Sequence, residues 1–327
     1  VTDGTMKLIA ENPGNISGWM TDHDGNLRVA ITSDGVNTSL LYRDSESESF
    51  KTILTTDFKV RVDPLFFTFD NKNLYVASNR NRDKSAIYTF DITETQEKEL
   101  IFENDQVDVS GLMYSKKRKV LTGVNYTVAK REIFFFDDWR KDIQNKLERK
   151  FPGYEVGITS FSKDEKDAVV VTYSDKSRGT YYSYDVEKNE LNELAKISPW
   201  INEDHMAEMK PITYTSRDGL TIPGYLTLPV GSDGKNLPFV VHPHGGPWAR
   251  DSWGYNSEVQ FLANRGYAIF QMNFRGSTGY GRKFWESSFK QWGKTMQDDI
   301  TDGVNWLIDQ GIADPDRIAI YGASYGG

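Results

Sequence analysis

The sequence contains no cysteine. This absence excludes disulfide bonds, a catalytic thiolate and cysteine-bound metal, but it does not identify the compartment, because a reducing cytosol and many periplasmic proteins both tolerate it. No apolar run is long enough to cross a bilayer, so no membrane partner is expected. Basic residues are in deficit, with 39 Lys and Arg against 47 Asp and Glu, which argues against a nucleic-acid partner.

What remains is the composition of a globular protein, with 38% hydrophobic and 26% charged residues. At 327 residues the chain is longer than a typical single domain, so two domains are expected. The chain starts with Val1 rather than methionine, and no signal segment precedes it. We therefore expect that processing or truncation has removed the natural start.

The first 200 residues contain a repeat of short strands separated by polar turns. Four aspartates that each follow an aromatic-rich strand are 47, 46 and 48 residues apart, and the strands before them keep the same spacing. These aspartates are Asp44, Asp91, Asp137 and Asp185. A period in the forties with about four strands per unit is typical of β-propeller blades, whereas an all-β sandwich would need evenly spaced turns by coincidence.

Residues 1–200 are accordingly predicted to form about four blades of a propeller that is incomplete at its N-terminal end. The four aspartates are interpreted as turn formers that accept hydrogen bonds from nearby backbone amides. One charged segment, residues 138–147, is predicted to be a short, solvated helix inserted on a blade.

The pattern of expected secondary structure changes after a polar, proline-containing linker at residues 198–205. A hairpin is predicted at 212–228, and strands then alternate with helices as far as a strand at 317–321. This alternation is typical of a doubly wound, mostly parallel sheet covered on both faces. Residues 201–327 are therefore predicted to be the N-terminal part of an α/β-hydrolase domain that stops after the nucleophile strand.

The last strand leads into Gly322-Ala323-Ser324-Tyr325-Gly326, a G-x-S-x-G segment. In a nucleophile elbow the chain turns sharply from strand to helix, so that the serine hydroxyl stands above the sheet, and flanking glycines remove side chains that would collide. The alternative is an ordinary glycine-rich turn with a bystander serine. We favour Ser324 as a catalytic nucleophile.

A second glycine-rich loop, residues 242–247, follows the first parallel strand. A histidine followed by glycines at this place supplies one backbone donor of an oxyanion hole, so the predicted donors are the N–H groups of Gly246 and Tyr325. His242 and His244 are poor candidates for the base, because chain order puts the acid and then the histidine after the serine. No third ligand accompanies these two histidines, so neither metal nor another cofactor is expected.

Four segments together resemble the prolyl oligopeptidase family of serine peptidases, in particular its acylaminoacyl-peptidase-like branch. They are residues 244–247 (His-Gly-Gly-Pro), 273–281 (Asn-Phe-Arg-Gly-Ser-Thr-Gly-Tyr-Gly), 314–318 (Asp-Pro-Asp-Arg-Ile) and 322–327 (Gly-Ala-Ser-Tyr-Gly-Gly). The resemblance implies a β-propeller that caps an α/β-hydrolase domain and restricts the substrates to short peptides. It also implies a loop near the site at residues 275–281, for which a structural role is expected.

Two departures from the family bear on substrate. Prolyl oligopeptidases proper and dipeptidyl peptidases carry an oxyanion-binding tyrosine about where this chain has His244, and the paired glutamates that bind a free peptide N-terminus in dipeptidyl peptidases are not evident here. The predicted function is therefore a serine peptidase of acylaminoacyl-peptidase or oligopeptidase type. The alternatives are a carboxylesterase, a dipeptidyl aminopeptidase of the same family, and a non-catalytic propeller module used for binding.

The expected partner is a short peptide, and homo-oligomerisation is left open. Because the acid and the histidine of the triad are expected beyond residue 327, the chain is interpreted as a fragment that is inactive by itself.

Overall fold

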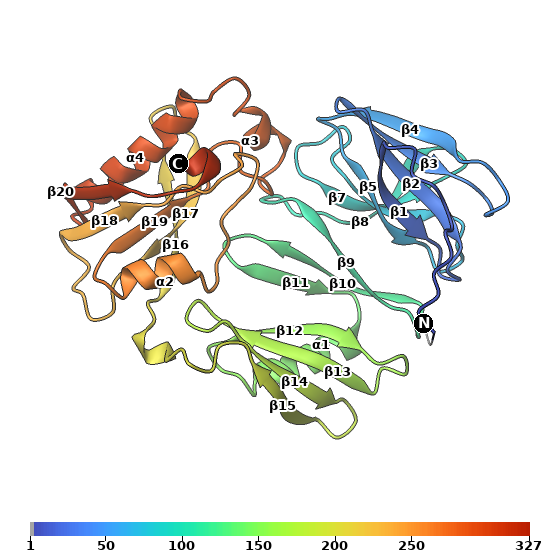
Figure 1. Ribbon diagram of the computed structural model, residues 1–327, viewed down its shortest axis with the longest axis horizontal. Coiled ribbons are helices and arrows are strands. Elements are labelled where there is room, and N and C mark those ends of the chain that lie inside the picture. Colours follow the sequence, from blue (N-terminus) through green and yellow to red (C-terminus); the bar gives the residue numbers. More distant parts are fainter. Residues whose placement is uncertain (1–2) are drawn as a thin grey trace. The chain divides into compact units, whose positions relative to one another are not determined.

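The computed structural model describes residues 3–327 (Figure 1). The chain packs into two compact units that divide between Leu112 and Met113. A domain boundary near residue 200 stays a prediction, because the division into compact units falls elsewhere. Within residues 3–327 no helix is long and apolar enough to cross a membrane.

The first unit contains two antiparallel sheets, each with four strands in chain order. The first sheet comprises β1 (Ile16–Thr21), β2 (Leu27–Ser33), β3 (Asn37–Tyr42) and β4 (Lys51–Asp57). The second comprises β5 (Val62–Phe67), β6 (Leu74–Ser78), β7 (Ala86–Asp91) and β8 (Gln96–Phe102). Their core is built from apolar side chains of the inner strands, including Val29, Leu74, Val76 and Phe90. Each sheet corresponds to one predicted repeat.

Two further sheets follow, and β9 (Val109–Ser115) crosses the division between the units. The third sheet has three strands in the order β11-β10-β9, with β10 at Val120–Thr127 and β11 at Arg131–Phe135. The fourth sheet again has four strands in chain order. These are β12 (Glu155–Phe161), β13 (Asp167–Tyr173), β14 (Thr180–Asp185) and β15 (Glu190–Lys196).

Helix α1 (Asp138–Glu148) follows β11, at the point in the repeat where the other three sheets continue with a fourth strand. A helix was predicted here, but the prediction that it is solvated was wrong. Ile143 and Leu147 are buried in a core shared with β13, and Arg140 and Gln144 are buried as well. The buried polar pair is hydrogen-bonded, Arg140 Nη1 donating to Gln144 Oε1 at 3.1 Å. A buried guanidinium and amide made this face look like a solvated one in the sequence.

The turn-forming role of the repeat aspartates holds at three of the four positions. Asp91, Asp137 and Asp185 accept hydrogen bonds from backbone amides two or three residues later. In the case of Asp137 this bond caps the N-terminus of α1. Asp44 instead accepts a hydrogen bond from the hydroxyl of Tyr42 at 2.8 Å.

The chain then forms a five-stranded mixed sheet with the order β16-β17-β19-β18-β20. Its strands are β16 (Met209–Thr215), β17 (Thr221–Thr227), β18 (Leu237–Val241), β19 (Ala268–Met272) and β20 (Ala313–Ile320). Strand β18 runs parallel to both β19 and β20, and the hairpin β16–β17 joins β19 in antiparallel fashion. The helices are α2 (Ser257–Ala263), α3 (Arg282–Glu286) and α4 (Thr295–Asp309), with 3₁₀ turns η1 (Glu203–His205) and η2 (Ser324–Gly326).

Both faces of this sheet are covered, and Figure 1 shows α2 and α4 on opposite sides of it. Side chains alternate along the parallel strands: Phe239 and Phe270 face the core that α4 closes with Leu307. Val240 and Ile269 face the core that α2 closes. This two-sided burial requires the central strands to be continuously apolar. The parallel pairing of β18 with β20, in which Val241 lies opposite Ile320, places the carboxyl ends of these two strands next to each other.

Candidate active site

Ser324 lies just beyond the carboxyl end of β20, at the start of η2. Its side chain is exposed, and its φ of 58° falls in the left-handed region that serine rarely adopts. Strained residues of this kind are concentrated at functional sites, and a strand-to-helix turn with a strained serine is the geometry of a nucleophile elbow.

The glycines on either side of Ser324 are required by close backbone approach. A Cβ at Gly322 would overlap the carbonyl oxygen of Gly326, and a Cβ at Gly326 would overlap the carbonyl oxygen of Pro243. The elbow therefore packs directly against the loop at residues 242–247, with bare backbone on both sides. Neither position has room for a side chain.

We predict that Gly326→Ala lowers kcat/KM of the whole protein about 100-fold. The added methyl group must push the elbow away from Pro243, and a displacement near 1 Å at a reacting group costs about two orders of magnitude. Gly327→Ala is the matched control, because a Cβ there would lie no closer than 3.4 Å to another heavy atom. Steady-state kinetics on both purified variants measures the difference. Equal activities would contradict the tight contact.

The diglycine loop, defined here as residues 242–247, reaches the serine itself. A Cβ built on Gly245 would lie 3.2 Å from Ala323 O and 4.0 Å from Ser324 Oγ. Gly246 is exposed and has a φ of 124°. The structure thus brings together the two sequence segments in which the nucleophile and an oxyanion donor were predicted.

Tyr325 is the second residue of the 3₁₀ turn η2, where a backbone N–H has no intrahelical acceptor. The Tyr325 side chain makes other contacts: its ring packs on Phe274 and Trp292, and its hydroxyl donates to Met296 Sδ at 3.7 Å. The assignment of the Gly246 and Tyr325 amides as oxyanion donors stays a prediction.

The two histidines of the diglycine loop are both buried, and each stacks on an aromatic ring. His244 stacks on Phe274 with ring centroids 4.4 Å apart, its Nδ1–H donates to Gly245 O at 2.7 Å, and its Nε2 lies 2.9 Å from Ser277 Oγ. Burial lowers the pKa of His244, which favours its neutral form at pH 7. His242 stacks on Tyr321. Within residues 3–327 no group of three or more metal-binding side chains is gathered.

Comparison with known proteins places these features. Residues 253–327 match the sequence model described as "Prolyl oligopeptidase family". The whole chain aligns with dipeptidyl aminopeptidase BIII of Pseudoxanthomonas mexicana at 33% identity over 343 residues, which is 100% of this chain and 48% of that protein. Dipeptidyl peptidase family member 6 of Caenorhabditis elegans aligns at 26% identity over 354 residues, 98% of this chain and 48% of that protein. The C-terminal part of the chain, residues 253–327, belongs to the prolyl oligopeptidase family.

Solved structures agree on the fold. A puromycin-hydrolysing peptidase of Mycobacterium tuberculosis superposes with a TM-score of 0.75 at 20% identity, covering 98% of this chain and 50% of that one. A puromycin hydrolase gives a TM-score of 0.70 at 19% identity, with coverages of 97% and 50%. The chain is thus a partial β-propeller followed by an α/β-hydrolase domain, and it spans about half the length of the relatives that it matches.

The family motif at residues 273–281 contains a buried ion pair. Arg275 is bound to Asp299 of α4 in a bidentate manner, Nε to Oδ2 at 2.8 Å and Nη2 to Oδ1 at 2.7 Å. Its Nη1 lies 2.7 Å from Asp218 Oδ2, in the turn between β16 and β17. The hydrogen bonds to Asp299, followed by those to Asp218, raise the pKa of Arg275. This network holds the loop near the site in place, which is the structural role expected for it.

Sequence reasoning missed both acidic partners of Arg275. Asp299 is 24 residues from Arg275 along the chain, and nothing in its local pattern distinguishes it from the other acidic residues of α4. Asp218 was seen only as part of a hairpin turn. An Arg inside a family motif is itself a signal that a buried carboxylate should be sought, but it does not say which one.

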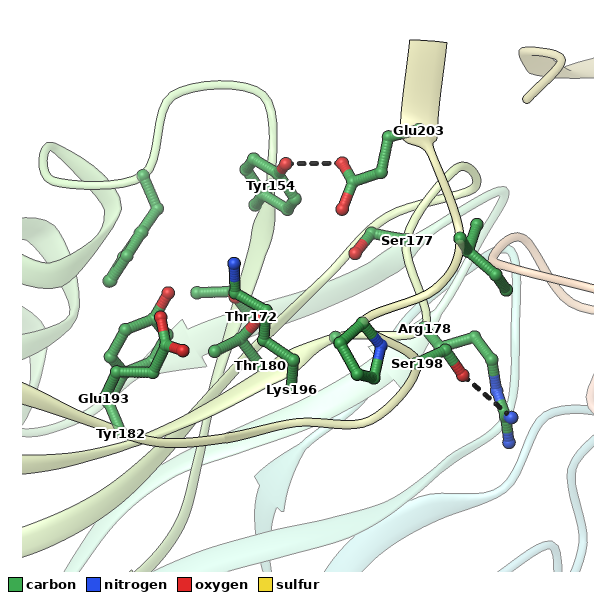
Figure 2. Close-up of a pocket in the computed structure, with 14 residues that line it drawn as sticks. Tyr154, Thr172, Ser177, Arg178, Thr180, Tyr182, Glu193, Lys196, Ser198 and Glu203 are labelled. Carbon is green, nitrogen blue, oxygen red and sulfur yellow. Dashed lines mark hydrogen bonds between the residues drawn. The ribbon is translucent and has the colours of Figure 1, made fainter. Parts of the chain in front are cut away.

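Two cavities lie among the described residues named below, and only the first borders the candidate site. One of about 380 Å³ borders the elbow and is lined by Pro243, Ile320, Tyr321 and Tyr325 among others. The other, of about 260 Å³, lies on the fourth sheet and the linker after it (Figure 2). In it the Tyr154 hydroxyl donates to Glu203 Oε2 at 2.5 Å, a bond that raises the pKa of Tyr154 to about 12. No predicted site residue lines the second cavity.

Proposed function

We propose that the protein that carries this chain is a serine peptidase that hydrolyses short peptides, of acylaminoacyl-peptidase or oligopeptidase type. The observation that carries the proposal is the strained, exposed Ser324 directly beside the diglycine loop. Membership of the prolyl oligopeptidase family supports it. The relatives are about twice as long, so the activity is assigned to the whole protein and not to these 327 residues.

In the proposed reaction Ser324 Oγ forms a bond to the carbonyl carbon of the scissile peptide, and its proton passes to a histidine expected after residue 327. The amides of Gly246 and Tyr325 donate to the oxyanion of the tetrahedral intermediate, where each donor contributes about 3 kcal/mol. The C–N bond then breaks and the amine leaves with the proton. Water attacks the acyl-enzyme by the same sequence of steps and releases the acid.

A second candidate, a dipeptidyl aminopeptidase, is favoured by one specific observation: a protein of that name aligns with the entire chain at 33% identity. Acylamino-acid-releasing enzymes of rice and Arabidopsis align over 40% and 29% of the chain. The two activities differ in the substrate N-terminus, which is blocked in one case and free in the other.

The test uses the whole protein and a fluorophosphonate probe, followed by peptide mass spectrometry. Labelling is expected at Ser324. Labelling at another serine, or none, contradicts the proposal. Rates on an N-acetyl amino-acid anilide, a free dipeptidyl anilide and a nitrophenyl ester then separate the acylaminoacyl, dipeptidyl and esterase activities. A preference for the free dipeptidyl anilide would establish the second candidate.

A further inference from the structure

The turn between β10 and β11, residues 128–130, is held by side chains of the hydrolase domain. Arg250 donates through Nη2 to Val128 O at 3.2 Å and through Nη1 to Thr127 O at 3.4 Å. The hydroxyl of Tyr225 donates to Ala129 O at 2.7 Å. Three successive carbonyls of one blade thus accept hydrogen bonds from the domain that contains Ser324.

A fourth contact involves the remaining residue of the turn. The Lys130 ammonium lies 3.6 Å from the ring centroid of Trp253, a cation–π geometry. Three of these four contacts therefore go to backbone carbonyls, and the fourth goes to the side chain of Lys130.

Arg250 is also fixed on the side of the hydrolase domain. Its Nη2 donates to the Tyr280 hydroxyl at 2.8 Å, and its guanidinium stacks over the Tyr280 ring at 4.4 Å. A Cβ at Gly279 would lie 2.7 Å from Arg250 Nη1, so a side chain there would displace the guanidinium from this position. The Arg250 side chain thus lies between the turn of the blade and the family motif at 273–281.

The backbone around Arg250 is held equally firmly. Thr278 N donates to Ala249 O at 2.9 Å, and Asp251 N donates to Asn273 Oδ1 at 2.7 Å. Asn273 Nδ2 returns a bond to Asp251 O at 3.1 Å. Because Arg250 is four residues from Gly246, a shift of this anchored segment is passed to the diglycine loop through a short stretch of chain.

We propose that Arg250 is a positioning residue for the diglycine loop, through which the β10–β11 turn of the blade sets the position of the Gly246 amide. This inference rests on the proposed function, because it gives the loop its role as an oxyanion hole. In this arrangement the blade supports catalysis directly, in addition to any effect on substrate access. Misplacing an oxyanion donor impairs transition-state binding more than ground-state binding.

The test compares variants of the whole protein on a small anilide substrate. Arg250→Gln removes the bonds to the turn and the stacking on Tyr280, and it is expected to lower kcat about 10-fold with KM changed less than about twofold. The rate of fluorophosphonate labelling at Ser324 is expected to fall by a similar factor, since phosphonylation also develops an oxyanion. Arg250→Lys, which keeps the charge but has a single nitrogen, should lie between. Arg265→Gln is the matched control and should keep its kcat, because Arg265 is exposed after the end of α2 and its Nη1 donates to Phe261 O at 3.0 Å.

A second variant tests the role of the β10–β11 turn of the blade. Replacing residues 128–130 by two glycines shortens the three-residue loop to a two-residue hairpin turn and removes the Val128 and Ala129 positions whose carbonyls Arg250 and Tyr225 contact. The same loss of kcat is expected, and unchanged kcat would show that the blade takes no part. If the wild-type protein is active and the Arg250→Gln variant keeps the wild-type kcat, or loses activity only through a higher KM, the proposed role of Arg250 is overturned. An inactive, unlabelled wild type instead contradicts the proposed function.

Discussion

Ser324→Ala is expected to lower kcat/KM of the whole protein for a peptide substrate by at least roughly 10⁴-fold. In the proposed mechanism the Ser324 hydroxyl forms the acyl-enzyme, and the proposed oxyanion donors alone would supply only residual catalysis. Because Ser324 is exposed, the variant should keep its melting temperature within about 1 °C, as surface substitutions do. Steady-state kinetics and thermal unfolding on the same preparation give both quantities.

The matched control is Ser287→Ala. Ser287 lies just after α3 and its hydroxyl donates to Phe284 O at 2.7 Å, so its loss removes a local hydrogen bond but no part of the proposed site. This variant should keep its activity and its fluorophosphonate labelling. If Ser324→Ala retained more than about one part in a hundred of the wild-type kcat/KM, Ser324 could not be the nucleophile.

The elbow and the blades could be predicted because both are written in local sequence. At the elbow, two glycines are required by overlaps with backbone oxygen atoms that the turn itself creates. In the propeller part, the repeat recurs because each unit uses the same order of strands, so the second and third strands keep one period. Signals of this kind need no knowledge of which distant residues meet.

Features that depend on distant contacts could not be predicted. The carboxylates of Asp218 and Asp299 converge on Arg275 from a hairpin turn and a helix, and sequence spacing gives no hint of it. The anchoring of residues 128–130 was equally hidden, because three of its contacts go to backbone carbonyls. The short helix α3 was missed since its five residues are too few for a periodic pattern.

The second large effect is expected in stability, at the pair formed by Arg275 and Asp299. Asp299 has no exposed side-chain surface and Arg275 has 7%, so both charges are removed from water. Asp299→Ala leaves the guanidinium buried with only the half-exposed Asp218 as a partner. Losing one member of a buried ion pair costs about 3–5 kcal/mol. We therefore expect a large fall in melting temperature, measured by differential scanning calorimetry.

Two comparisons separate this effect from a general loss of charge. Asp314→Ala breaks another Asp–Arg contact, to Arg317 at 2.6 Å, but Arg317 is 53% exposed, so this variant should lose much less stability than Asp299→Ala. The double variant Arg275→Met, Asp299→Leu removes both charges at once, and it should be more stable than Asp299→Ala because no unpaired charge stays buried. If Asp299→Ala were no less stable than Asp314→Ala, the ion pair would not be what holds residues 273–281 against α4. The activity of the double variant is a separate measurement. It shows whether the position of residues 273–281 that catalysis requires depends on the two charges or only on a filled core between Arg275 and α4.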